Sequence, residues 1–310
     1  MAHAHRIGAD ENGLGARLGP LVVTAALARV TDRGHRLLER KAPKRLRDDL
    51  GDSKELVSHK DFALGEAWAR ALTGDAAKSP AELFERLTFE GVSALQEPCP
   101  GHVREQCWSI ANEAFIADDR TVERLKKHLY HWSERGVEVL EIRSSVLCVK
   151  RLNEARGIGH NRFVSDLHAM ERLVLALRER AGSDVFAVCG KVGGMGDYSR
   201  FFGPLSMRLH SVLASGRARS GYYFPGLGEV HFVRDVDSHD QLVMLASMVG
   251  KYVRELLMSR VSSFYTSGTD AVKPSGYHDP VTSKFVLSTA LNRRKKKIPD
   301  QCFERARDEL

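Results

Sequence analysis

The sequence lacks any hydrophobic run long enough to cross a membrane, for which an α-helix needs about 20 predominantly apolar residues. It also lacks an N-terminal segment with the apolar stretch that is typical of an export signal. Cysteine is scarce: there are five, an odd number, and most lie far apart among the 310 residues. This pattern does not fit a disulfide framework and is typical of a reducing compartment. We therefore expect a cytoplasmic protein with no membrane partner.

Metal-binding cysteine patterns are also missing. Cys99 and Cys107 flank His102, but the spacing matches no zinc motif, and we interpret the grouping as chance. No internal repeat is present. The composition is that of a folded protein, with 43% hydrophobic and 28% charged residues. A chain of this length forms one large domain or two modest ones with a substantial core.

Basic residues outnumber acidic ones, 47 to 40, which gives a formal net charge of +7. An excess of positive charge favours an anionic partner, most often nucleic acid; a merely basic surface is the alternative. Residues 36–47 form either a solvated helix face or a phosphate-facing edge. Residues 198–230 place aromatic side chains between arginines, which suits nucleic-acid stacking. A strand pair packed on the core is the interpretation that we prefer for this stretch.

Apolar periodicity predicts alternating strands and helices. A first strand ends at Asp10 and Glu11, and we interpret residues 20–29 as its continuation. Further strands are predicted at 137–149, 184–189 and 229–233, and helices at 62–135, 161–181, 237–265 and 281–291. Asp237 is a suitable N-cap for the longest helix. The alternation predicts an α/β or α+β sheet domain.

Residues 62–135 are interpreted as a helical insertion. They contain a capping box with proline at the first helical position, residues 79–82, but no catalytic pattern. The sheet domain is then discontinuous, comprising residues 1–61 and 136–291, and a basic C-terminal tail follows at 292–310. The basic cluster within this tail is interpreted as solvated, with a nucleic-acid tether as the alternative.

Two adjacent acids, Asp10 and Glu11, lead directly into the turn Gly13-Leu14-Gly15. Neighbouring side chains on a regular strand point to opposite faces, so this pair serves one site only where the strand ends or bends. Glycine permits such a bend. Acids followed by open backbone amides suit a hard metal ion and a phosphate, whereas a solvated acidic turn is the alternative.

The stretch 7–20, IGADENGLGARLGP, resembles the first motif of type 2 ribonucleases H, the family that includes the HII and HIII enzymes. Residues 52–56, DSKEL, are similar to the family's Asp-Ser-Lys-Lys-Leu. Residues 245–251, LASMVGK, resemble its helix motif Ala-Ala-Ser-Ile-Leu-Ala-Lys, and Gly276-Tyr277 is similar to its late Gly-Tyr pair. The four motifs occur in the family's order, and the resemblance covers about residues 5–60 and 137–291.

The resemblance implies a ribonuclease H-like mixed central sheet flanked by helices. It also implies an Mg²⁺- or Mn²⁺-dependent endonuclease that hydrolyses RNA in RNA/DNA hybrids or at ribonucleotide junctions, with Asp10, Glu11 and Asp237 as catalytic metal ligands. Residues implied to contact the substrate are Gly13, Leu14, Gly15, Ser53, Lys54 and Tyr277. For three positions an ordinary structural role is the alternative: a helix cap at 237, a surface lysine at 54 and a packing residue at 277.

Two departures from the family pattern bear on activity. Leu14 stands where the family often has arginine, which removes a phosphate contact. The family also places a third aspartate at the end of the strand near 185–188, and here Cys189 and Gly190 follow instead. Asp197, in the next glycine-rich loop, is the candidate substitute ligand. The alternatives are therefore a catalytically inactive nucleic-acid-binding module of this fold and a nuclease for another structured nucleic acid; the sequence predicts no oligomeric state.

Overall fold

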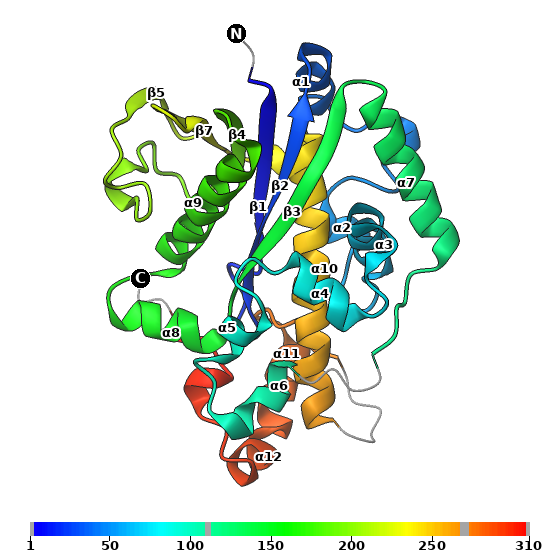
Figure 1. Ribbon diagram of the computed structural model, residues 1–310. Coiled ribbons are helices and arrows are strands. Elements are labelled where there is room, and N and C mark those ends of the chain that lie inside the picture. The colour runs from blue at the N-terminus through cyan, green and yellow to red at the C-terminus, as the bar shows by residue number, and fades with distance from the viewer. Residues whose placement is uncertain (1–2, 109–112, 267–272, 308–310) are drawn as a thin grey trace.

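The computed structural model describes residues 3–108, 113–266 and 273–307, and within them seven strands form one mixed sheet (Figure 1). The strands are β1 His5–Asn12, β2 Leu21–Val30, β3 Val137–Leu147, β4 Val185–Gly190, β5 Ser211–Ser215, β6 Arg219–Phe224 and β7 Gly228–Val233. Their order across the sheet is β3-β2-β1-β4-β7-β6-β5. The central strands β1, β4 and β7 are parallel, and the outer pairings are antiparallel.

The segment predicted to continue the first strand instead reverses and forms β2. Residues 13–20 turn the chain, with Gly13 at φ +90° and Gly19 at φ +77°. Only glycine adopts such angles without strain. After the turn β2 runs antiparallel to β1, so that Asp10 pairs with Thr24. The prediction of a continuation was wrong because apolar periodicity does not report chain direction.

Helices cover both faces of the sheet (Figure 1). The α-helices are α1 Asp32–Leu38, α2 Ser53–Leu56, α3 Ala63–Thr73, α4 Pro80–Leu87, α5 Val92–Gln96, α6 Arg104–Trp108, α7 Asp119–Ser133, α8 Val149–Gly157, α9 Arg162–Ala181, α10 Gln241–Tyr265, α11 Pro280–Ser288 and α12 Ala290–Lys295. Helix α10 packs with β1, β2 and α3, and helix α9 lies on the opposite face. This arrangement confirms the predicted fold class, a mixed central sheet flanked by helices.

Residues 62–135 contain helices α3 to α7, as predicted, joined by loops in which Thr88 forms a β-bridge with Ser144 of β3. Ser79 accepts a hydrogen bond from the Glu82 amide and caps α4. The helices share one hydrophobic core with α10, in which Trp68 and Leu125 are fully buried beside Leu245. The segment therefore packs as part of the main body, and the predicted domain boundaries remain a prediction.

The long helix begins later than predicted. Asp240, not Asp237, is its N-cap and accepts hydrogen bonds from the amides of Leu242 (3.0 Å) and Val243 (3.1 Å). Asp240 also forms a buried ion pair with Arg6 of β1. Asp237 lies one turn earlier, in a 3₁₀ helix (Val236–Ser238), where its side chain is not used as a cap.

The aromatic and basic stretch forms the strand pair β5 and β6, of which β6 packs on the core as we preferred, whereas β5 is exposed at the sheet edge. Tyr222 and Phe224 of β6 are fully buried, with Tyr198 and Phe202 packed against them. The segment after the basic cluster also packs: Phe303 is buried, and Glu304 forms a β-bridge with Leu18. In the described residues, no helix has the length and apolar character needed to span a membrane.

Candidate active site

Asp10 and Glu11 meet above Gly190, the last residue of the neighbouring strand β4. A Cβ at Gly190 would lie 2.5 Å from Asp10 Oδ1 and 3.3 Å from Glu11 Oε2. The missing side chain therefore leaves the space that both carboxylates occupy. The pairing of β1 with β4 ends at Ala9 and Cys189. Two adjacent residues of β1 can therefore reach one site.

A further acid, Asp166 of α9, lies against this pair and was not predicted. Its side chain is 2% exposed, and Oδ1 has no hydrogen-bond partner in the described structure. Burial and then the charge of Asp10 raise the pKa of Asp166 well above its ordinary value. Burial and then Asp166 raise the pKa of Glu11 to about 8. The signal in the sequence was a carboxylate on the apolar face of helix 161–181, one residue before Leu167.

Asp237 contributes a fourth carboxylate, with Lys54 beside it. The Lys54 Nζ lies 4.0 Å from Asp237 Oδ2, and the lysine side chain is 77% exposed. Burial raises the pKa of Asp237, and the Lys54 ammonium opposes that shift. The charges of Glu11 and Asp237 both raise the pKa of Asp10, after the larger effect of burial. The structure thus brings the three predicted ligands and Lys54 together.

Ser53 and Ser247 connect two of the sequence motifs to the acids. Their hydroxyl oxygens are 2.9 Å apart, and both residues are buried. The Ser247 hydroxyl also hydrogen-bonds the carboxylate of Asp10, which opposes the rise of its pKa. The Asn12 amide donates to the Ser247 carbonyl at 3.1 Å. Strand β1, helix α2 and helix α10 are therefore joined by hydrogen bonds directly beneath the acids.

Tyr277 lies beside the turn that follows β1. The Arg254 guanidinium stacks 4.6 Å from the centre of the Tyr277 ring, and a Cβ at Gly13 would lie 2.5 Å from Arg254 Nε. The Gly276 carbonyl accepts hydrogen bonds from two amides of the turn segment, those of Arg17 and Leu18. Gly15 is exposed, with open space around it, and Leu14 is half-buried. The predicted substrate-contact residues of the turn and Tyr277 therefore share one edge of the molecule.

Asp197 has other partners. It accepts hydrogen bonds from the Ser199 amide and the Tyr222 hydroxyl, both at 2.9 Å, and the Ser199 bond lowers its pKa most. Asp197 is therefore held by its loop and by β6, and Asp166 is the additional carboxylate beside Glu11.

Cys189 and Gly190, at the expected place of the third aspartate, each fit their surroundings in the fold. Cys189 is fully buried in the core beneath α9, where burial and then Asp166 raise the pKa of its thiol. Gly190 forms the floor under Asp10 and Glu11. A larger residue at 190 would push into the acids, while a carboxylate from α9 reaches the same region from the side.

The four carboxylates fit a hard divalent cation by their chemistry. Mg²⁺ and Mn²⁺ prefer oxygen ligands, and clustered carboxylates repel each other until a cation is bound. The partnerless Oδ1 of Asp166 and the raised pKa values of the acids are signs of this repulsion and burial. As they are placed, no three His, Cys, Asp or Glu side chains of the described residues stand ready to hold an ion. Ligation therefore requires rotation of these carboxylates toward one another.

Several solved structures similar to this chain are ribonucleases H. The RNase HII of Archaeoglobus fulgidus, solved in complex with PCNA, is 16% identical; the match covers 98% of this chain and 95% of that one, with a TM-score of 0.41. Bst-RNase HIII in complex with Mn²⁺ is 14% identical over 98% and 67% of the two chains, with a TM-score of 0.46. The ribonuclease H2 of Pyrococcus horikoshii OT3 is 14% identical over 96% and 92%, with a TM-score of 0.39. No family model and no curated protein matches this chain. Identities and TM-scores this low do not assign it to a family.

Proposed function

We propose that this protein is a divalent-metal-dependent endonuclease that hydrolyses RNA phosphodiester bonds in RNA/DNA hybrids or at ribonucleotide junctions. The observation that carries the proposal is the convergence of four acids, Asp10, Glu11, Asp166 and Asp237, at the ends of β1 and β4. The net positive charge of the chain supports a nucleic-acid partner. A cytoplasmic location stays a prediction from the sequence.

The acids would hold Mg²⁺ or Mn²⁺, which supplies an activated water and stabilises charge on the leaving oxygen. Ser247 orients the Asp10 carboxylate through its hydroxyl. Lys54 is exposed at the rim beside Asp237, where its ammonium would contact a phosphate of the substrate. Its positive charge also lowers the pKa of Glu11 and favours the ionised form that binds metal.

The turn and Tyr277 would select ribose. Gly15 leaves its backbone open to an approaching strand, and a backbone amide can donate to a 2′-hydroxyl. Arg254 stacks on the Tyr277 ring and also lies against Gly13, so it holds the ring next to that turn. Discrimination of RNA from DNA at this edge would depend on the 2′-hydroxyl, the group that distinguishes the two.

The test is cleavage of a labelled RNA/DNA hybrid, and of a duplex with one ribonucleotide, with Mg²⁺ or Mn²⁺. We expect the unchanged chain to cleave, and Asp10→Asn and Asp166→Asn to lose about 100-fold or more, since each removes a metal ligand worth several kcal/mol. Glu179→Gln, an exposed change on the same helix as Asp166, is the matched control and should retain activity.

The alternatives give different results. A chain that binds hybrids in a salt-sensitive manner but is as inactive as Asp10→Asn would be a nucleic-acid-binding module. The position of Cys189 and Gly190, where an aspartate was expected, is the observation that favours this alternative. Faster cleavage of a branched DNA or a folded RNA than of the hybrid would assign another structured nucleic acid as substrate.

A further inference from the structure

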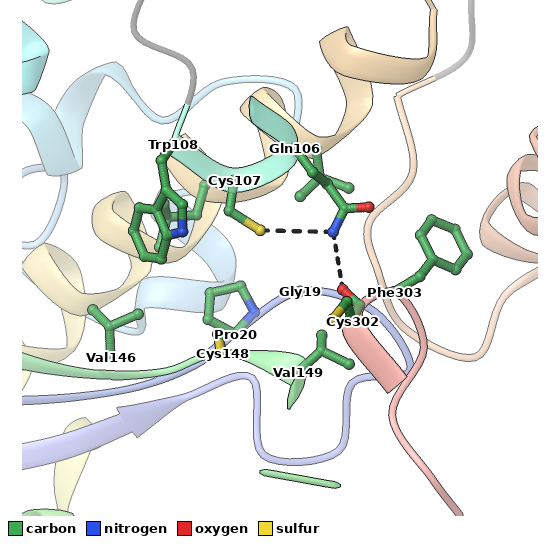
Figure 2. Close-up of a pocket in the computed structure, with 12 residues that line it drawn as sticks. Gly19, Pro20, Gln106, Cys107, Trp108, Val146, Cys148, Val149, Cys302 and Phe303 are labelled. Carbon is green, nitrogen blue, oxygen red and sulfur yellow. Dashed lines mark hydrogen bonds between the residues drawn. The ribbon is translucent and has the colours of Figure 1, made fainter. Parts of the chain in front are cut away.

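Three of the five cysteines line one pocket, and a fourth lies in the same region, although most are far apart in the sequence. Cys107, Cys148 and Cys302 line this pocket together with Gly19 and Pro20 (Figure 2). Cys99 lies in the same region, because the carbonyl of the preceding Pro98 accepts a hydrogen bond from Lys150, two residues after Cys148, and Cys99 packs against the same hydrophobic core as Cys107. All four are free thiols. The spacing of Cys99 and Cys107 alone matches no metal motif; the fold adds Cys148 and Cys302 from distant parts of the sequence.

The cysteines belong to segments that the fold holds in place independently of any bond between sulfurs. Gln106 Nε2 donates to the Cys302 carbonyl at 2.9 Å, which links α6 to the C-terminal segment. Asn153 of α8 donates to the carbonyls of Gln301 and Glu304. Lys150 Nζ donates to the Pro98 carbonyl at 2.8 Å, next to Cys99. The backbone segments that carry the four thiols are therefore held in place by hydrogen bonds between them.

The pocket itself is apolar apart from the sulfurs and Gln106. Its other walls are Trp108, Val146, Val149, Leu257, Val261 and Phe303. The empty space measures about 350 Å³, part of it open to solvent. An apolar cavity surrounded by thiols lacks the several polar partners that an ordered water needs. Thiolates in such a cavity suit a thiophilic metal, since soft ligands select zinc, copper and iron–sulfur centres.

We propose that Cys99, Cys107, Cys148 and Cys302 bind a thiophilic metal centre, and that an iron–sulfur cluster is the form that this cavity fits. A single zinc ion bonds each sulfur at about 2.3 Å and so draws its ligands close together. In the described residues no three metal-ligating side chains are arranged for one ion. Sulfurs that surround a cavity instead suit a cluster of several irons, which takes four thiolate ligands. This site is separate from the acids and does not depend on the proposed nuclease activity.

Such a centre would join three parts of the molecule. Cys99 and Cys107 come from the helical segment after β2, Cys148 from the start of α8, and Cys302 from the C-terminal segment. Cys148 is the residue that immediately precedes α8, so its position is fixed by the start of that helix. The pocket also touches Gly19 and Pro20, the end of the turn that carries Gly13 and Gly15. Metal binding here would stabilise the turn beside the acids without contacting them.

The test begins with the full chain, purified without a metal-binding tag and without oxygen. We expect about four irons and four acid-labile sulfides per chain, with visible absorption that bleaches on reduction. Each of Cys99→Ser, Cys107→Ser, Cys148→Ser and Cys302→Ser should lose most of this metal. Cys189→Ala, which changes the buried cysteine outside the cluster, is the matched control and should retain it.

A second measurement uses the unchanged chain, so that it tests the site even if the serine variants fail to fold. The metal-free chain is incubated with ferrous iron and sulfide, or with zinc alone, and its cysteines are then alkylated and counted by mass spectrometry. Protection of the same four cysteines supports the site. Zinc at one ion per chain, with no iron, would retain the thiolate metal site but overturn the cluster. No metal after purification together with no uptake and no protection would overturn the proposal.

Discussion

At the scale of single residues, the site depends on the absence of a side chain at Gly190. Asp10 and Glu11 project from neighbouring positions of β1, and both reach the space above a residue without a side chain. The expected aspartate of β4 would have needed part of that space. Asp166 reaches the same acids from α9, so the number of carboxylates is restored from another element.

Gly190→Ala should therefore reduce metal-dependent cleavage by about tenfold or more, because the new methyl group would displace the Asp10 carboxylate by a fraction of an ångström. Initial rates across a series of Mn²⁺ concentrations measure the effect, and the apparent metal affinity should fall with the rate. Gly157→Ala, where a Cβ meets nothing within 4 Å, is the control. Equal activity of the two variants would show that Gly190 is not the floor of the site.

The acids should also make metal-free stability depend on pH. Burial, and next Asp166, raise the pKa of Glu11 from 4.5 to about 8 in the folded state. A carboxyl with a raised folded pKa keeps its proton in the folded chain while the unfolded chain has lost it. Its contribution to the free energy of unfolding therefore falls as pH rises from about 4.5 to about 8. Asp166→Asn removes one acid and should reduce the loss of unfolding free energy as pH rises.

Urea midpoints at pH 5 to 8.5 in the presence of a chelator would measure this difference between the two chains. Saturating Mn²⁺ should restore stability at the alkaline end for the unchanged chain more than for Asp166→Asn, because a bound ion stabilises the folded state. Identical pH profiles for the two chains would contradict the placement of Asp166 among the acids.

At the scale of elements, the start of α10 separates two aspartates three residues apart. Asp240 caps the helix and pairs with the buried Arg6. Asp237 is released from capping by the 3₁₀ turn before the helix and approaches Lys54 instead. One aspartate therefore serves the fold, and the other is free for the site.

Substitution of Asp240 should affect mainly stability, and substitution of Asp237 should affect mainly cleavage. Asp240→Ala should lower the free energy of unfolding by about 3 kcal/mol or more, because it removes a cap and leaves Arg6 with only Glu39 as its acidic partner. Asp237→Asn should abolish most cleavage with a change in stability within about 0.5 kcal/mol. Chemical denaturation and hybrid cleavage of both variants measure the contrast, with the exposed Asp235→Asn as control. A stability loss at Asp237 equal to that at Asp240 would favour a structural role for both.

At the scale of the whole molecule, the C-terminal segment supports the turn beside the acids. Arg305 is buried and donates to the carbonyls of Gly13 (2.6 Å) and Gly19 (2.9 Å), the two ends of the turn. Phe303 fills the core between α10 and α11. A segment that the sequence suggested was a basic tail thus holds the first motif in shape.

Arg305→Ala should lower the free energy of unfolding by about 3 kcal/mol, since hydrogen bonds from a charged group contribute about 1.5–3 kcal/mol each. It should also raise KM for the hybrid more than it lowers kcat, because the proposed function assigns substrate binding, and no metal ligand, to the turn. Arg307→Ala, an exposed neighbour, is the control for both measurements. A loss confined to kcat would contradict the assignment of the turn to binding.

The sequence by itself determined most of the elements and the order of the motifs. Helices at 161–181 and 237–265 and strands at 137–149, 184–189 and 229–233 lie within a few residues of their predicted ends, because apolar spacing and capping residues act locally. The acidic pair and its glycine turn were recognisable for the same reason. Asp10, Glu11, Asp237 and Lys54 were singled out from local motifs and their order.

Only the tertiary structure decided the reversal of β2, the role of Asp166 and the gathering of four cysteines. A turn of glycines permits either direction of the next strand, and pairing with β1 selects one. The roles of Asp166 and of the cysteines depend on neighbours that are tens to hundreds of residues away in the sequence. Burial, which sets their pKa values and isolates them from water, is a property of the packed chain and has no local signature.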